Sequence, residues 1–306
     1  MAFTAQDVKK LREMTNVGMM DCKKALQATD GDMDAAIDWL REKGLAKAAK
    51  KAGRIAAEGL AYATVIDGVG VVIEVNSETD FAAKTDKFLD LVKSLSEIVA
   101  KDAPADVEAL KACTYPGTNL TVTEKMQELV MSIGENMQIR RFDRFTANQS
   151  VSYVHMGGTH GVLVNLEADV DATEIGKNVA MQIAAMNPKY WDKAQVPQED
   201  VDKELAVQMA LMDNDPKMAS KPAQVKEKIA AGKIASFYKD YCLLQQDFVR
   251  ADLFKGDVAG YIADAAKKLG GSVKFVNAIH YIKGEGIEKK EEDFAAEVAA
   301  QIAGAK

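Results

Sequence analysis

The sequence predicts an α+β fold built from two related halves, each a small antiparallel sheet covered by helices. Two hairpin-like segments carry this prediction, because each joins two strand-like arms through a glycine-containing turn and precedes a helical pattern. The segments also correspond in order, since Tyr153 follows Tyr62 by the same 91 positions that separate Gly161 from Gly70. Apolar periodicity adds helices before, within and after these halves. We therefore expect an internal duplication with helical additions.

Residues 1–54 predict a module of three short helices with a linker. Thr4 followed by Asp7 is a helix-start signal, and apolar side chains then recur at helical spacing in three stretches. Gly44 is expected to end the third helix. The Ala- and Lys-rich stretch over 46–57 predicts a helical linker. Because no aromatic residues alternate with its basic ones, a solvated charged face is favoured over a nucleic-acid patch.

The loop Val17-Gly18-Met19-Met20 is apolar although it joins two predicted helices. A module of this size has a small core, so part of the loop could remain exposed and dock a partner. The same methionines could instead be ordinary core residues. Spacing alone leaves both interpretations open.

The first half is predicted over residues 55–146. Asp67-Gly68 is a strong hairpin-turn signal, and the arm after it is apolar at nearly every position, so both faces of that arm are expected to be covered. The predicted elements, in order, are strands over 60–66 and 69–75, helices over 79–100 and 121–138, and a strand that starts near 139.

The second half is predicted over residues 147–284, with Gly157-Gly158 near its turn. An antiparallel helical hairpin is inserted at about 190–240, where two periodic stretches flank proline-containing turns. A final amphipathic helix is expected over 292–303, within a terminal module at 285–306. The predicted elements after the turn are helices over 173–186, 198–212, 223–240 and 257–269, and a strand over 272–282.

Composition favours a cytoplasmic protein of several folded units. The chain has 306 residues, of which 48% are hydrophobic and 28% charged. No apolar run approaches the ~18 residues of a membrane span, and the N-terminal residues predict no secretory signal. Three scattered cysteines fit reduced thiols better than a disulfide framework. The net charge of −7 argues against a direct electrostatic nucleic-acid binder.

The motifs of known enzyme chemistries are not recognisable in the sequence. His155 and His160 could face a metal across a turn, but histidines at such positions are more often structural, so no metal site is predicted. The cysteines have no Cys-x-x-Cys pairing and no neighbouring histidine. The chain lacks a P-loop, and its short Gly-x-Gly lacks the third glycine of a dinucleotide site. No cofactor is predicted, and a non-enzymatic role is favoured.

One polar segment, Asn76 to Lys84, separates a buried strand from a helix and contains a single aromatic residue, Phe81. An acid such as Asp80 is common in the first turn of a helix, where it stabilises the helix dipole. Phe81 could likewise be a staple into the sheet. Considered without other information, these structural interpretations are favoured over a binding role.

The chain resembles the translation elongation factor Ts family along its whole length and in the same order. The matching motifs are Met14-Thr15-Asn16-Val17-Gly18-Met19-Met20-Asp21-Cys22-Lys23-Lys24-Ala25-Leu26, Gly31-Asp32, Trp39-Leu40-Arg41, Glu74-Val75-Asn76, Thr79-Asp80-Phe81, Gly134-Glu135-Asn136, His155, Gly161-Val162-Leu163-Val164 and Gly284-Glu285-Gly286-Ile287-Glu288-Lys289.

The resemblance implies a ubiquitin-associated-like N-terminal module and a guanine nucleotide exchange factor for the GTPase elongation factor Tu. Residues matching the family motif, Thr79, Asp80, Phe81 and Ala82, would approach the partner near its nucleotide and disturb its Mg²⁺ site. Val17, Gly18, Met19 and Met20 would hold the same GTPase domain, as would the final helix, and His155 and Met156 would reach another partner domain. A homodimer or an assembly of two Tu and two Ts chains stays open.

Three departures from the family pattern affect these expectations. Ala82 stands where a larger aliphatic residue is common, which weakens apolar contact behind Phe81. His160 occupies a usually apolar position, and Asp247 replaces a proline in the stretch Gln246-Asp247-Phe248-Val249. Two rival classes remain: a binding or chaperone-like module without exchange activity, and an enzyme that uses His155 or Cys242.

Overall fold

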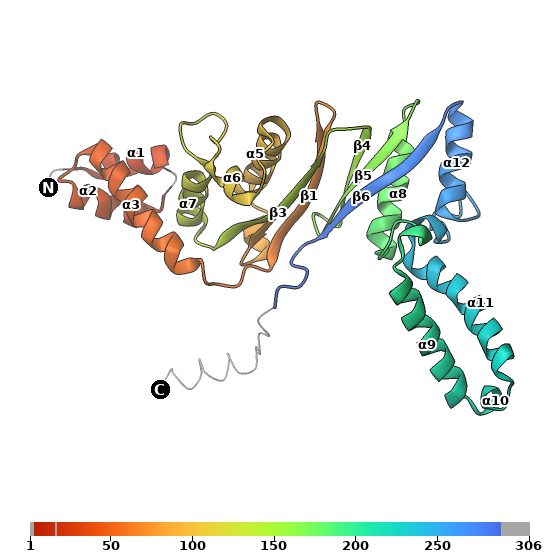
Figure 1. Ribbon diagram of the computed structural model, residues 1–306. Coiled ribbons are helices and arrows are strands. Elements are labelled where there is room, and N and C mark those ends of the chain that lie inside the picture. Colours follow the sequence, from red (N-terminus) through yellow and green to blue (C-terminus); the bar gives the residue numbers. More distant parts are fainter. Residues whose placement is uncertain (1–2, 16, 289–306) are drawn as a thin grey trace. The chain divides into compact units, whose positions relative to one another are not determined.

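The computed structural model describes residues 3–15 and 17–288, apart from the side chains of residues 45–50. Its chain divides into two compact units, the first formed by Met1–Ala61, Ile73–Phe142 and Ile282–Lys306, and the second by Tyr62–Val72 and Asp143–Tyr281. The predicted α+β class is confirmed, with N-terminal helices and two three-stranded antiparallel sheets covered by helices (Figure 1). The helix predicted over 292–303 lies outside the described residues.

The N-terminal module consists of three helices, as predicted: α1 (Ala5–Thr15), α2 (Met19–Ala28) and α3 (Met33–Lys51). The Thr4–Asp7 signal is used at the start of α1, where the Asp7 carboxylate accepts from the Thr4 N–H at 2.8 Å. The helices bury a common apolar core of Val8, Leu11, Val17, Cys22, Ala25, Leu26, Ala36 and Leu40.

The prediction that Gly44 ends the third helix is wrong, because α3 continues to Lys51. A Cβ atom at residue 44 would lie 2.1 Å from the Met131 Sδ atom, which belongs to α7 (Val122–Ile133). The glycine therefore serves close packing between two helices and not helix termination.

The first sheet has the strand order β1 (Glu58–Ile66), β2 (Val69–Ser77) and β3 (Met137–Phe145). Asp67 and Gly68 both have positive φ angles, 51° and 82°, as the predicted two-residue hairpin turn requires. Every residue of β2 after its first is buried, which confirms that both faces of this arm are covered.

Two predicted helices of the first half have different limits. The helix predicted over 79–100 is divided into α4 (Asp80–Ala83) and α5 (Asp86–Asp102), because the Thr85 hydroxyl caps a new helix start and accepts from the Phe88 N–H. The helix predicted over 121–138 ends at Ile133, where Gly134 adopts the left-handed conformation with φ of 90°. A short helix, α6 (Val107–Ala112), was not predicted.

The second sheet has the corresponding order β4 (Gln149–His155), β5 (His160–Ala168) and β6 (Val273–Ile282). β4 pairs with β5 in antiparallel register, so that His155 lies opposite His160. In each sheet the strand that returns after the helices pairs with the second arm of the hairpin. This shared topology agrees with the duplication inferred from the sequence.

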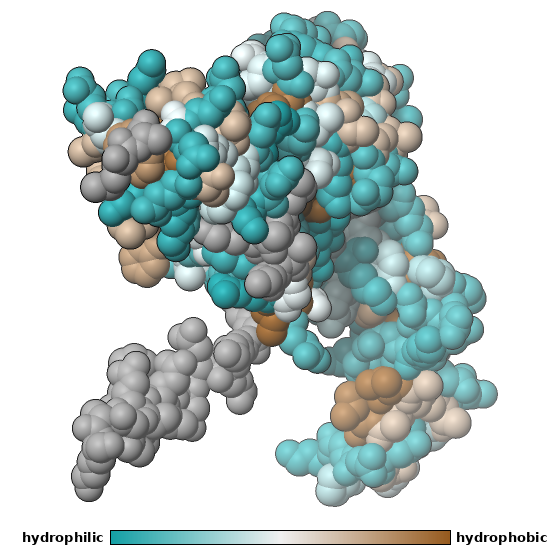
Figure 2. Space-filling model, turned by 90° about the vertical axis from the view of Figure 1, so that its left-hand side faces the viewer, coloured by the Kyte–Doolittle hydropathy of each residue, from teal (hydrophilic) through white to brown (hydrophobic). Residues whose placement is uncertain are grey.

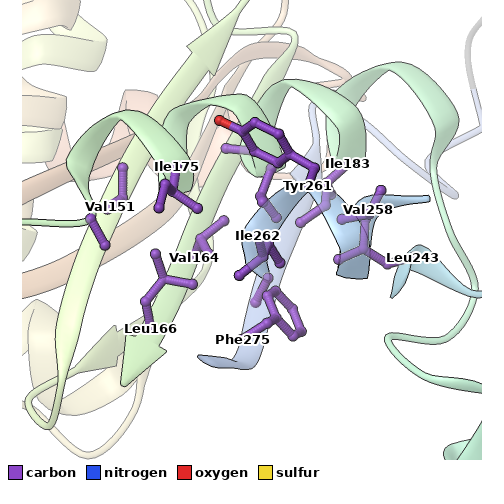
Figure 3. Packing of buried hydrophobic residues seen from close by; sticks show 14 of the residues in the cluster. Val151, Val164, Leu166, Ile175, Ile183, Leu243, Val258, Tyr261, Ile262 and Phe275 are labelled. Carbon is purple, nitrogen blue, oxygen red and sulfur yellow. The ribbon is translucent and has the colours of Figure 1, made fainter. Parts of the chain in front are cut away.

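The core of the second unit lies between its sheet and two helices, α8 (Thr173–Met186) and α12 (Val258–Leu269), which lie where the sequence predicts them. Figure 3 shows aliphatic side chains of β4, β5 and α8 meeting aliphatic and aromatic side chains of α12 and β6. The labelled residues are Val151, Val164, Leu166, Ile175, Ile183, Leu243, Val258, Tyr261, Ile262 and Phe275.

The predicted helical hairpin is also confirmed. α9 (Gln198–Asn214) and α11 (Ala223–Tyr241) run side by side and are joined through the single turn α10 (Pro216–Ala219) (Figure 1). At the tip, the buried Lys226 Nζ atom donates to the Asp213 carboxylate at 2.6 Å and to the Ala219 carbonyl at 3.0 Å. These bonds close the turn between the two helices.

The loop with the Asp247 departure has a defined geometry. The buried Gln182 side chain of α8 donates to the Asp247 carbonyl at 3.2 Å and accepts from the Val249 N–H at 2.8 Å. Short 3₁₀ turns precede the hairpin (Lys193–Gln195) and follow it (Leu243–Gln245). Side-chain bonds to α8 thus fix this loop.

The face of the molecule in Figure 2 is covered mainly by hydrophilic residues, with small hydrophobic areas between them. Among the residues that the structure describes, no helix combines the length and the apolar character needed to cross a membrane.

Candidate functional site

The short helix α4 is held at its start by one threonine and one glutamate. The Thr79 hydroxyl accepts from the Ala82 N–H at 3.2 Å, so Thr79 caps the helix. The Thr79 N–H and hydroxyl both donate to the Glu135 carboxylate, at 2.9 and 2.7 Å. Hydrogen bonds to a charged acceptor are among the stronger ones, so Glu135 fixes the position of this turn.

A second carboxylate, that of Glu78, joins the same two segments of the chain, because its partner is the residue that follows Glu135. Glu78 accepts from the Asn136 N–H at 2.6 Å and pairs with Arg54 at 3.4 Å. The Asn136 side chain in turn donates to the Arg54 carbonyl at 2.9 Å. The residues before β1, the end of β2 and the connection between α7 and β3 are thereby joined around one turn.

Phe81 points away from this framework and is 79% exposed. The interpretation of Phe81 as a staple into the sheet is therefore wrong. The reason is the orientation of α4, which buries Ala82 and Ala83 and leaves the preceding side chain outside. The Lys84 ammonium lies 5.9 Å from the centre of the Phe81 ring. A large apolar ring is thus presented to solvent on a turn that hydrogen bonds hold in place.

Asp80 lies in the first turn of α4, as expected of a helix-start acid, and pairs with Lys84 at 2.6 Å. The hydrogen bond from Lys84 is the main reason that the Asp80 pKa lies below its usual value. The carboxylate is accordingly charged at neutral pH. Lys84 lies close to both the acid and the ring, and its ammonium pairs with one of the two Asp80 carboxylate oxygens.

An open hollow beside Phe81 completes the site. Its other large apolar member is Ile55, which is 47% exposed, and Lys283 pairs with Glu58 at its border. The residues that line it are Gly53, Arg54, Ile55, Ala57, Glu58, Glu78, Thr79, Asp80, Phe81 and Lys283. Local sequence patterns do not indicate roles for Ile55, Glu135 or Asn136. For the last two, the signal was Gly134, which ends α7 and frees the next residues for the turn.

Below the turn, a fully buried carboxylate anchors β2. Glu74 accepts from Arg140 at 2.9 Å, from Arg141 at 2.7 Å and from the Gly284 N–H at 2.8 Å, and Asn76 adds a fourth donor. Burial alone would raise the Glu74 pKa, but these donors together outweigh it and hold the pKa below its usual value. The matched motifs at Glu74-Val75-Asn76 and Gly284-Glu285-Gly286 therefore meet in one buried cluster.

The loop at Val17 to Met20 divides between core and surface. Val17 is buried in the module core, and Gly18 precedes α2 with open space where a side chain would be. Met19 and Met20 are 50% and 63% exposed. Of the two interpretations, the core one thus describes Val17, and the surface one describes the methionines.

His155 and Met156 lie at the end of β4 and in the turn after it. The Tyr153 hydroxyl lies 2.8 Å from the His155 Nδ1 atom, which fixes the imidazole ring. Met156 has a positive φ angle of 47° and is 73% exposed. The turn thus presents a flexible apolar side chain next to a held histidine.

The remaining candidates for chemistry have unfavourable surroundings. Burial, and to a smaller extent the charge of Asp192, raises the pKa of the Cys242 thiol to about 11, and burial also raises the pKa of Cys22. Such thiols stay protonated and are poor nucleophiles at neutral pH. In the described part of the chain, no group of three or more His, Cys, Asp or Glu side chains is arranged to hold a metal ion.

Comparisons with known proteins agree with these observations. The family model described as elongation factor TS matches residues 78–285. The chain is 45% identical to elongation factor Ts of Magnetococcus marinus, over 99% of this chain and 100% of the relative. It is 46% identical to elongation factor Ts of Nitratiruptor sp., over 99% and 100%, and 46% identical to that of Paramagnetospirillum magneticum, over 98% and 97%.

Proposed function

Because the chain belongs to the elongation factor Ts family, and so has a role in translation elongation, we propose that it is the guanine nucleotide exchange factor for elongation factor Tu. In this role it binds the GDP-bound partner, disturbs the Mg²⁺ and phosphate site, and promotes release of GDP so that GTP can bind. The observation that carries the proposal is Phe81, an exposed ring on a turn fixed by Thr79 and Glu135.

The proposed action of Phe81 is that of a wedge between two helices of the partner. Covering a Phe side chain removes roughly 150–250 Å² from water, which is about 4–6 kcal/mol as an upper estimate. A ~10⁴-fold change in nucleotide affinity corresponds to about 5.5 kcal/mol of differential binding. One ring can supply much of this energy if it fits only the nucleotide-loosened state. Partner and nucleotide then weaken each other reciprocally.

Asp80 supplies the electrostatic part of the mechanism. Its carboxylate is charged at neutral pH, and in the free chain it is paired with Lys84. A carboxylate brought near the partner's nucleotide competes for the Mg²⁺ surroundings, and weaker Mg²⁺ coordination weakens phosphate binding, because the ion neutralises phosphate charge. Ala82 is buried behind the ring and so supports α4 from inside.

Two further surfaces complete the proposed contact. Gly18, Met19 and Met20, next to the buried Val17, would hold another part of the GTPase domain, and His155 with Met156 would reach a different partner domain. We propose that the chain consists of four functional units, at residues 1–54, 55–146, 147–284 and 285–306, which carry these contacts. No bond is made or broken by the chain itself, and no cofactor, metal or direct nucleic-acid contact is needed. We expect action in the cytoplasm, and light scattering distinguishes a homodimer or an assembly of two Tu and two Ts chains from a one-to-one complex.

The test is the release of labelled GDP from elongation factor Tu in the presence of the full chain. The chain should accelerate release, and Phe81→Ala should reduce the acceleration tenfold or more, since most of the ring area that the partner would cover is lost. Leu269→Ala is the matched control, because Leu269 is also an exposed hydrophobic residue and lies on α12, outside the site. Unchanged exchange by Phe81→Ala would exclude the wedge. No acceleration by the wild type, with partner binding retained, would favour a binding module.

A further inference from the structure

The three histidines of the chain lie in one row in the second unit, although the sequence separates His280 widely from the other two. His155 and His160 face each other across β4 and β5, with ring centres 5.8 Å apart. His280 on β6 stacks on His160, with ring centres 5.2 Å apart. The row therefore connects all three strands of the sheet and ends beside the turn that carries Met156.

The contact between His160 and His280 depends on their protonation. The His160 Nδ1 atom lies 2.9 Å from the His280 Nε2 atom, so one nitrogen donates and the other must be an unprotonated acceptor. If both rings are charged, two N–H groups face each other and the bond is lost. The pair can hold the geometry of the row only while it carries at most one charge.

The groups around His160 favour its neutral form. Burial is the main cause that lowers the His160 pKa from its ordinary value of 6.5, and the charge of His155 lowers it further. The titratable groups that the described contacts place along the row are Tyr153 and His155 on β4 and His280 on β6. Since the folded-state pKa of His160 is depressed, the stability from its neutral form is present above pH 6.5 and is lost as the pH falls below that value.

We propose that His280 is a positioning residue for the His155–Met156 contact: through His160 it holds the turn between β4 and β5 in its binding geometry while the histidine pair carries at most one positive charge. This inference rests on the proposed function, in which that turn reaches elongation factor Tu. Binding through the His155–Met156 turn then depends on pH, whereas binding through Phe81 does not.

The first experiment needs no partner. NMR titration of the free full chain from pH 8.0 to 5.0 follows the imidazole signals and the Met156 methyl signal, assigned with Met156→Leu. We expect the Met156 signal to move with the same midpoint as His160, and His280→Asn to abolish this coupling and raise the His160 pKa. A His160 titration unchanged by His280→Asn, or a Met156 signal that does not follow His160, overturns the proposal. Thermal unfolding at pH 8 verifies that each variant is folded.

The second experiment measures the affinity of the full chain for elongation factor Tu between pH 7.5 and 5.5. We expect a loss of about three- to tenfold on acidification, as for the uptake of one proton by a group whose pKa is held below its ordinary value. His160→Val should remove this loss of affinity. Phe81→Ala should bind more weakly at every pH but should lose affinity on acidification by the same factor as the wild type. If the wild type and His160→Val lose affinity equally on acidification, the positioning role is overturned. If the chain binds no Tu at any pH, the proposed function fails, and the NMR titration still decides the histidine pair.

Discussion

The two halves of the molecule place very different surfaces at the same point of a shared topology. After the first hairpin, the connection from β2 to α5 contains α4 and exposes Phe81. After the second hairpin, the connection from β5 to α8 has no aromatic residue and buries Ala172. Both connections are fixed, but only the first offers an exposed aromatic ring to a partner. A duplicated framework can thus keep its rigidity while only one copy carries the binding element.

The hydrogen bonds that fix the two connections differ in a similar way. In the second half Asp169 accepts from the Ser272 N–H at 2.6 Å, and Asp171 accepts from the Thr173 N–H at 3.0 Å. These bonds join the connection to β6 and to the start of α8. In the first half the equivalent role belongs to Glu135, which follows α7 and accepts both bonds from Thr79 at the start of α4.

The largest expected effect compares Glu74 with Asn165, which occupies the corresponding position 91 residues later in the second sheet. Both are buried, but Glu74 has four donors, whereas the Asn165 Oδ1 atom has no hydrogen-bond partner among the described residues. We expect Glu74→Gln to lower the free energy of unfolding by about 2–3 kcal/mol, since Arg140 and Arg141 lose their charged partner. Urea unfolding measures this value.

Asn165→Leu is the matched change and should alter the free energy of unfolding by less than about 1 kcal/mol, because it replaces an unsatisfied amide by an apolar group of similar size. The depressed pKa of Glu74 also gives a pH signature. Its stabilisation is complete above pH 4.5, is lost as the pH falls below that value, and should be missing from Glu74→Gln. Equal destabilisation by both substitutions would contradict the comparison.

The second effect concerns Glu135, whose carboxylate holds Thr79 in the first half. We expect Glu135→Ala to slow exchange about tenfold, because Thr79 loses both bonds to its carboxylate and Phe81 is no longer held in one position. Asp169→Ala is the control from the second half: it should lower the melting temperature and leave the rate of GDP release unchanged. If Glu135→Ala and Asp169→Ala give the same rate of GDP release, the rigidity of the connection from β2 to α5 does not matter for function.

The smallest effect concerns Lys84, which pairs with Asp80 in the free chain. We expect Lys84→Gln to raise the Asp80 pKa toward its ordinary value and to change the exchange rate less than threefold, since exposed ion pairs contribute about 0–1 kcal/mol. NMR titration of the Asp80 carboxyl and the GDP-release assay measure the two quantities. A tenfold loss of exchange would make Lys84 itself part of the contact.

Much of the fold follows from local signals in the sequence. Asp67-Gly68 fixes a hairpin, and the apolar periodicity of α8 gives its limits at Thr173 and Met186. One error arose where a longer-range contact overrides a local rule, because Gly44 permits packing on Met131 and does not end α3. Another arose where one local signal overrides another, because the Thr85 cap divides one periodic stretch into two helices.

The site was less accessible to sequence reasoning for the same reason. Periodicity cannot distinguish an exposed Phe81 from a buried one, because that depends on which side of a one-turn helix faces the protein. The roles of Glu135 and Asn136 depend on partners more than fifty positions away. The resemblance to a family, carried by motifs along the whole chain, indicated the turn where local physics did not.

The bond from the Gly284 N–H to the buried Glu74 carboxylate has a consequence for how the protein is made. During synthesis Glu74 leaves the ribosome long before residue 284, and the larger part of the second unit, Asp143–Tyr281, is translated in between. Until then this carboxylate lacks one of its four donors, and the first unit lacks the returning segment that begins at Ile282. The unit that starts first is therefore completed last, and chains truncated before that glycine carry a full second unit beside an unfinished first one.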